Sequence, residues 1–207
     1  MKNPVALLKH AALALLMASA AFMAQPAAAE SSIVFGGAGA FSTSARLDFA
    51  IVVPRFLQFQ VGTAGATIDQ VSFTVAAANV GSGVAQAGVG GDLGAGTVTV
   101  NVKANSGQVT ITPTNNSAGA GLGNGAGGAI AYTEILTTSS AAGTLPAPVL
   151  TNAGGAAVTP ALSAGTVTNR SATWTYAYAN TTVPNAGTYG TGGAATGGRV
   201  TYTASSP

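Results

Sequence analysis

The sequence predicts an all-β fold, an antiparallel β-sandwich of about nine or ten strands. Three observations lead to this prediction. Apolar and polar residues alternate over many short runs, which is the pattern of a half-buried strand. Stretches rich in Gly, Ala, Ser and Thr separate these runs, as turns and loops do. No long helical periodicity is found after residue 30. Two packed antiparallel sheets satisfy all three observations.

Residues 1–29 have the layout of a secretory signal peptide. Two lysines form a basic start, a short apolar run follows at residues 11–23, and small residues precede Glu30 as a cleavage site. The apolar run is shorter than the roughly 20 residues needed to cross a bilayer. We therefore expect cleavage, a single domain over residues 30–207 without a transmembrane segment, and a secreted, cell-surface or periplasmic location.

The first predicted strands surround a very apolar segment. We expect a short strand at residues 31–35 and a longer one at residues 45–53. One face of the longer strand carries four core candidates, Leu47, Phe49, Ile51 and Val53. Pro54 then interrupts the pattern, and proline in a strand occurs at an edge, an end or a bulge. We expect the chain to bend there and change sheets before a further strand at residues 56–62. A tight turn between two unrelated strands is the alternative.

Shorter strands are predicted along the rest of the chain. They span residues 68–77, 97–104, 107–113, 129–138, 171–179 and 198–205, with short pieces near 156–159 and 165–167. The two strands around Asn105-Ser106-Gly107 give the strongest hairpin signal. The further core candidates are Phe73, Val100, Ile111, Trp174, Tyr176 and Tyr202. The alternating aromatic residues of 171–179 could line a carbohydrate-binding face, but such a row more often packs across strands.

The residue types present argue against an enzyme. Residues 30–207 contain no Cys, His or Met, so a Ser-His-Asp triad, a Cys-His pair and an ordinary zinc or copper site all lack their side chains. The carboxylates stand singly, which suits neither a glycosidase pair nor a calcium site. The stretch GNGAGG at residues 123–128 matches a nucleotide-binding pattern, but a β-like segment follows it instead of a helix. We expect no cofactor and no metal.

The predicted mature chain carries very little charge. Residues 30–207 hold five basic and five acidic side chains, so the net charge is zero and no basic patch supports nucleic-acid binding. Charged side chains normally keep exposed strand edges from pairing with other molecules. A weakly charged all-β chain is therefore prone to associate with itself.

Two segments resemble known proteins. RLDFAIVVPRFLQFQVG at residues 46–62 and VPNAGTYGTGGAATGGRVTYTASSP at residues 183–207 resemble parts of secreted bacterial β-sandwich surface proteins of the fimbrial-subunit or WxL-like type. The resemblance implies an immunoglobulin-like or pilin-like sandwich that associates with itself or with other surface or fimbrial proteins. The chain has neither the Cys pair of chaperone–usher pilins nor a W-x-L motif.

Two functions follow as hypotheses. The first is a fimbria-like subunit or an extracellular matrix component that assembles through β-strand pairing. Its candidate donor strand is Ile33, Val34 and Phe35, although these residues could instead pair within their own domain. The second is a monomeric secreted module that binds a glycan or a surface protein through the Gly-rich loops at 78–96, 115–128 and 180–197.

Overall fold

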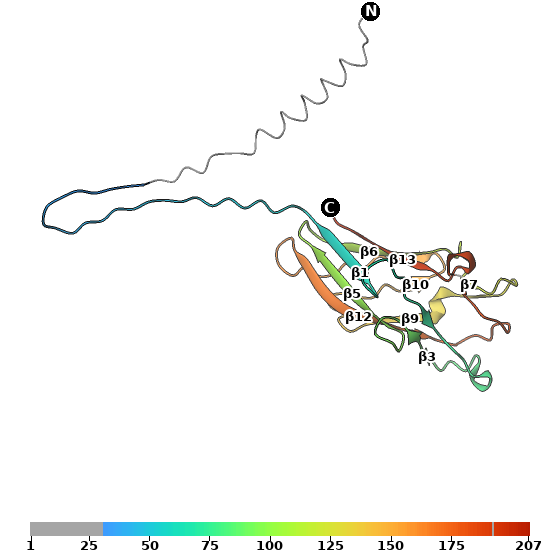
Figure 1. Cartoon of the computed structure of the whole chain (residues 1–207). Helices are drawn as coiled ribbons and strands as arrows, with labels where there is room; N and C mark the ends of the chain where they lie inside the picture. Colours follow the sequence, from blue (N-terminus) through green and yellow to red (C-terminus); the bar gives the residue numbers. More distant parts are fainter. Residues whose placement is uncertain (1–30, 192) are drawn as a thin grey trace, which may run out of the picture. The chain divides into compact units, whose positions relative to one another are not determined.

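The computed structural model describes residues 31–191 and 193–207, which divide into two units. Residues 31–53, called the arm here, contain no strand and no helix. The compact unit begins at Pro54 and is called the body; it holds every strand found among the described residues (Figure 1). The predicted signal peptide lies outside the described residues.

The body is all-β and its sheets are antiparallel. The longer strands are β1 (Leu57–Val61), β5 (Thr97–Ala104), β6 (Thr110–Asn115), β9 (Ile135–Ser139), β12 (Thr168–Tyr178) and β13 (Val200–Ser205). The two-residue strands are β2 (Val71–Ser72), β3 (Gln86–Ala87), β4 (Val89–Gly90), β7 (Leu122–Gly123), β8 (Ala129–Ile130), β10 (Leu150–Thr151) and β11 (Gly154–Gly155). Three short 3-10 helices are η1 (Ala77–Asn79), η2 (Tyr132–Glu134) and η3 (Gly193–Thr196). The described residues thus hold more strands than predicted, because glycine and proline divide the loops into short ladders.

The largest sheet has the order β1-β5-β12-β3, and β9 pairs with the opposite side of β12. β12 is its central strand, paired with β5 from Thr168 to Thr175 and with β9 from Trp174 to Tyr178. β6 and β13 form a second, two-stranded sheet. The short strands pair as β2 with β4, β7 with β8 and β10 with β11.

The predicted hairpin around Asn105 is wrong. β5 pairs with β1 and β12, whereas β6 pairs with β13, so the turn carries the chain from one sheet to the other. The Asn105 side chain holds the start of β1 instead: its Oδ1 accepts from Phe56 N at 2.9 Å, and its Nδ2 donates to Pro54 O at 2.8 Å. Turn residues favour a change of chain direction, but they do not decide whether the two strands that they connect pair with each other.

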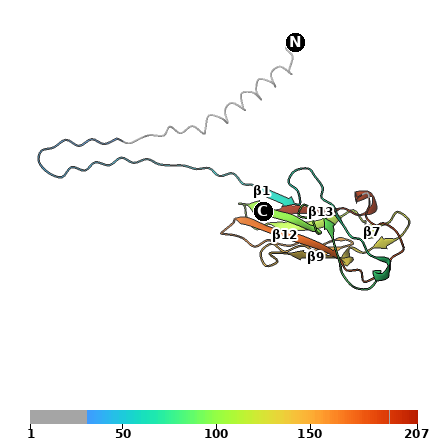
Figure 2. The same cartoon turned by 60° about the horizontal axis from the view of Figure 1, so that its bottom comes forward.

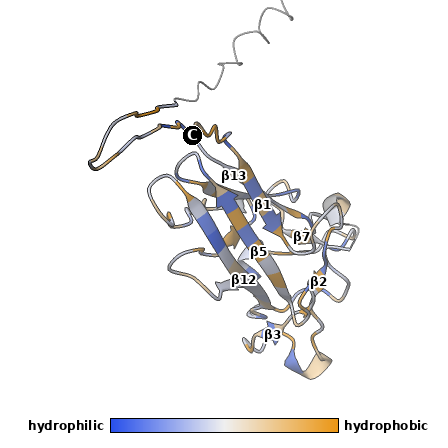
Figure 3. Ribbon diagram, turned by 60° about the vertical axis from the view of Figure 1, so that its left-hand side comes forward, coloured by the Kyte–Doolittle hydropathy of each residue, from blue (hydrophilic) through white to orange (hydrophobic). Residues whose placement is uncertain are grey.

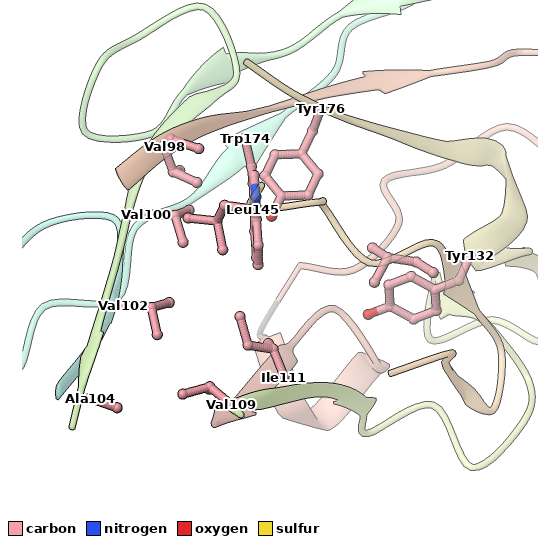
Figure 4. Packing of buried hydrophobic residues seen from close by; sticks show 12 residues of the cluster. Val98, Val100, Val102, Ala104, Val109, Ile111, Tyr132, Leu145, Trp174 and Tyr176 are labelled. Carbon is pink, nitrogen blue, oxygen red and sulfur yellow. The ribbon is translucent and has the colours of Figure 1, made fainter. Parts of the chain in front are cut away.

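Alternate residues of β5 and β12 build the core. Val98, Val100, Val102 and Ala104 form a buried row along β5, and Val109 and Ile111 approach that row from the other side (Figure 4). Figure 3 shows the matching alternation of hydrophobic and hydrophilic residues along the strands. The core candidates Val100, Ile111, Trp174 and Tyr176 are buried, and Phe73 and Tyr202 are half-buried against them.

The aromatic row of β12 packs inward. Trp174 is fully buried, and its ring centroid lies 5.2 Å from that of Tyr202 at an interplanar angle of 61°, an edge-on contact. Tyr178 is also buried and lies 6.3 Å from the Phe73 ring. The row is therefore part of the core and not a face that could bind a carbohydrate.

The prediction that four residues of the arm belong to the core is wrong. Leu47, Phe49, Ile51 and Val53 are exposed, with 85% of the Phe49 surface and 86% of the Ile51 surface accessible to solvent. The predicted strands at 31–35 and 45–53 are absent, and so is the change of sheets at Pro54, whereas the strand at 56–62 is found as β1. An alternating pattern marks a segment that can bury one face, but a strand also needs a neighbour, and the arm has none among the described residues.

Candidate functional site

Exposed apolar side chains gather in the arm. They are Ile33, Val34, Phe35, Phe41, Leu47, Phe49, Ile51, Val52 and Val53. The candidate donor residues are among them, and no strand pairs with them in the part of the chain that the structure describes. Burying a large apolar side chain is worth about 1.5–3 kcal/mol. The arm therefore carries a large unused capacity for association.

β1 is an edge strand of the largest sheet. Its hydrogen-bonded pairs with β5 alternate along the ladder, and one of them joins Gly62 N to Thr99 O at 2.7 Å. Counting back by twos from Gly62, the backbone groups of Gln60 and Gln58 also point toward β5. Those that point away from β5 therefore belong to Leu57, Phe59 and Val61. Over residues 31–191 and 193–207, no strand pairs with this outer edge.

β13 presents a second open edge. Asn116 N donates to Arg199 O at 3.4 Å, which fixes the alternation of its pairing with β6. The outward backbone groups of β13 belong to Val200, Tyr202 and Ala204. Within the described residues no strand pairs with this edge either.

The two open edges are neighbours. Cα atoms of β1 and β13 lie within 8 Å of each other, and Figures 1 and 2 show the strands side by side. Arg55 Nη2 donates to Pro207 O, so the end of the chain is tied to the start of β1. We call this region the seam: the outer edges of β1 and β13 with the half-buried side chains of Phe59, Val61, Val200, Tyr202 and Ala204.

The other side of β12 is covered where β9 does not pair with it. Beyond its pairing with β9, the free side of β12 is occupied by the loop around Ser163. Arg170 Nε donates to Ala161 O at 2.9 Å, and Asn169 N donates to Ser163 Oγ at 2.8 Å. Side chains and loop backbone thus satisfy the first part of β12 on this side.

The carboxylates of the body serve separate structural roles. Asp69 accepts from the Thr63 hydroxyl at 2.9 Å, and Asp92 accepts from Thr99 N at 2.8 Å. Glu134 is buried and accepts from both the backbone and the hydroxyl of Thr181. No group of three or more His, Cys, Asp or Glu side chains that could hold a metal ion occurs among the described residues.

The tyrosine hydroxyls near the core are also enclosed. Tyr132 donates to Gly197 O, and the hydroxyls of Tyr176 and Tyr202 lie 3.0 Å apart. Burial raises the pKa of Tyr132 and of Tyr176 to about 12, and it raises the pKa of Tyr202 well above 10. These phenols are neutral at ordinary pH and belong to the packing.

A shallow hollow of about 320 Å³ lies between two of the long loops. It is lined by Asn116, Ser117, Ala120, Gly121, Gly123, Gly125, Gly127, Gly128, Ala129, Ala195, Thr196 and Gly197. The lining has no charged side chain, so it supplies hydrogen bonds and small apolar surfaces but no acid, base or nucleophile beyond hydroxyls.

Comparison with family models, with curated protein sequences and with solved structures finds no match. Among the residues described here, no helix has the length and apolar character that a membrane span requires. The function must therefore be argued from the arm, the seam and the hollow.

Sequence reasoning found the apolar row of the arm but assigned it to the core. It missed the seam, because the open edges of β1 and β13 depend on which strands pair. The signal that could have identified the exposed arm is Pro54, which separates an apolar run from the first strand of the body.

Proposed function

We propose that this chain is an exported structural protein of the cell surface, a fimbria-like subunit or an extracellular matrix component that assembles through β-strand pairing. The observation that carries the proposal is the exposed row Leu47, Phe49, Ile51 and Val53. The row has the period of a strand but no neighbouring strand among the described residues. A segment of this kind buries its apolar face by adding to the sheet of another molecule.

The proposal includes an immunoglobulin-like β-sandwich for the body. The large sheet and the β6–β13 pair contribute residues to one core, as two packed antiparallel sheets do. Low charge supports the same function, since the body has few charged side chains to keep its open edges from pairing with other molecules. Export by the predicted signal peptide would place such a subunit outside the cell.

The test is assembly of purified protein comprising residues 30–207, followed by negative-stain microscopy and sedimentation. We expect polymers. The variant Phe49→Lys/Ile51→Lys loses two buried apolar contacts worth about 3–6 kcal/mol together, so the concentration needed for assembly rises at least ~100-fold. The control, Ile33→Lys/Phe35→Lys, adds the same charge to the other exposed apolar segment of the arm. A protein that stays monomeric at high concentration contradicts the proposal.

A second candidate function is the monomeric binding module. The observation that favours it is the hollow between residues 116–129 and 195–197, which belong to two of the loops that the sequence suggested for binding. Its neutral, hydroxyl- and amide-bearing lining suits an uncharged polar ligand such as a glycan. A stable monomer that binds a glycan array, and loses binding in Thr196→Val, would favour this function.

A further inference from the structure

Among the described residues, the apolar row of the arm has no neighbouring strand, and no strand pairs with the outer edges of the seam. The seam has two unpaired backbone edges and a row of apolar side chains that the core covers only in part. The arm contains no strand and carries an apolar row, Leu47, Phe49, Ile51 and Val53, on one face. A strand laid along the seam would satisfy backbone groups of β1 or β13 and cover the half-buried row.

The dimensions of the two parts agree. β13 has six residues and β1 has five, and the alternating part of the arm runs from Arg46 to Val53. At about 3.3 Å per residue, the arm segment is long enough to cover either strand from end to end. Its apolar row would lie beside Phe59 and Val61, or beside Tyr202, on the core side of the sheet, while Asp48, Ala50 and Val52 would face solvent.

We propose that residues 46–53 of one copy add as a strand to the seam of a second copy, along the open edge of β1 or of β13. The proposal rests on the function proposed above and names its partner: the acceptor is a second copy of this chain, and the donor is residues 46–53, not residues 31–35. Repeated from copy to copy, this head-to-tail contact produces an open chain of subunits.

The residues at the junction between the arm and the body bear on whether the arm could add to the seam of its own copy. A two-residue hairpin loop over Pro54 and Arg55 needs positive φ at its first central residue, which the proline ring forbids. A three-residue loop over 54–56 needs a left-handed residue at Phe56, a place usually taken by glycine. Residues 53–56 have no positive φ in the structure. The short turns that would fold the arm back are therefore disfavoured.

Disulfide trapping between copies tests the acceptor directly, because the chain contains no native cysteine. One preparation carries Ala50→Cys, near the centre of the arm segment. The other carries Thr203→Cys on β13 or Gln58→Cys on β1, both exposed near the centre of their strands. Because each cysteine is near the middle of its strand, the two lie close together in parallel as well as in antiparallel pairing. The matched control is Thr138→Cys, an exposed position on β9 at the other border of the sheet.

We expect the mixed preparations to form a disulfide-linked dimer with Thr203→Cys or Gln58→Cys and at least tenfold less with Thr138→Cys. Equal trapping at all positions, or trapping at Thr138→Cys alone, overturns the proposed acceptor while polymers still support the proposed function. Absence of polymers in the unmodified protein overturns the proposed function itself.

Insertion of a flexible linker tests the role of the junction. About eight Gly and Ser residues between Val53 and Pro54 exceed the usual length of a hairpin loop and allow the arm to reach its own seam at high effective concentration. We expect a monomer whose residues 46–53 are protected from hydrogen exchange. The control places the same linker between Ser44 and Ala45, before the donor segment, and retains polymers. Unchanged polymers with the linker at Val53 overturn the role of the junction.

Discussion

Asn180 shows how single polar residues fix the path of the chain after β12. Its backbone has a φ of 56°, a left-handed value that Asn tolerates better than most residues, and its side chain is fully buried. The side-chain Nδ2 donates to Asn79 O at 2.7 Å, and Oδ1 accepts from Gly81 N at 3.0 Å. One side chain thus ties the η1 loop to the end of the central strand.

Two substitutions at Asn180 separate the contribution of its side-chain hydrogen bonds from that of its left-handed backbone. Asn180→Gly keeps the left-handed backbone but leaves Asn79 O and Gly81 N without their partner, so we expect a loss of about 2–4 kcal/mol in the free energy of unfolding. Asn180→Ala adds the cost of a left-handed alanine, about 1 kcal/mol more. Urea denaturation measures both. An alanine variant as stable as the glycine variant would contradict the role of φ.

At the scale of elements, a close approach of glycines holds the loop before β5 against β12. Gly96 has a φ of 70°, and its carbonyl accepts from Tyr176 N at 2.9 Å. A Cβ on Gly96 would lie 2.7 Å from the Gly88 Cα and 2.9 Å from the Tyr176 carbonyl oxygen. Backbone surrounds this position, so only glycine fits.

Gly96→Ala and Gly94→Ala form a matched pair that tests this contact. Both residues have positive φ, at 70° and 74°, but a Cβ on Gly94 meets no atom within 4 Å. Both variants therefore bear the strain of a left-handed alanine, and Gly96→Ala bears the overlap as well. We expect Gly96→Ala to be less stable than Gly94→Ala by about 1–3 kcal/mol in thermal or urea unfolding. Equal free energies of unfolding for the two variants would show that the loop can shift to accommodate the added Cβ, which would contradict this role of Gly96.

The strands also show which parts of the fold could be predicted from the sequence. Strong alternation placed β1, β5, β12 and β13 within a few residues of their observed bounds. The same alternation failed in the arm, because periodicity reports the ability to bury a face and carries no information on where the partner strand is. The hairpin failed for a related reason, since Asn105 bonds to Pro54 and Phe56, which are distant in sequence.

At the scale of the whole molecule, the body relies on apolar packing and neutral hydrogen bonds. Amides and hydroxyls cross the outer face of the large sheet: Asn101 Nδ2 donates to Gln60 Oε1 at 3.1 Å, and the Thr97 and Thr175 hydroxyls lie 3.0 Å apart. The low content of charged residues in the sequence already indicated that apolar packing and neutral hydrogen bonds would dominate. It could not foresee the seam, because open edges are a property of the complete sheet order.

The buried tyrosines set the alkaline limit of stability. Tyr132 and Tyr176 have a pKa of about 12 in the folded protein against 10 in the unfolded chain, because burial disfavours the phenolate. The unfolded state therefore loses protons first, and stability that is full below pH 10 falls as the pH rises toward 12. At 1.36 kcal/mol per pKa unit, a shift of about two units at each residue sets an upper limit of about 5 kcal/mol on the loss.

Thermal unfolding followed from pH 8 to pH 12 checks this expectation. The melting temperature should decline steeply only above pH 10, and phenolate absorbance of these residues should rise together with unfolding. Tyr176→Phe removes one titrating group and should reduce the decline, with Tyr189→Phe, a half-buried tyrosine outside the core, as the control. A decline of equal steepness in Tyr176→Phe would assign the alkaline limit to other groups.

Trp174 has a practical consequence. It is the single tryptophan of the chain, it is fully buried in the body, and Tyr202 from the edge strand β13 lies against its ring. Indole emission therefore reports from one place only, directly beneath the seam, and nothing in the arm contributes to it. Fluorescence could distinguish a subunit that has lost its fold from an intact subunit that has merely parted from its neighbour.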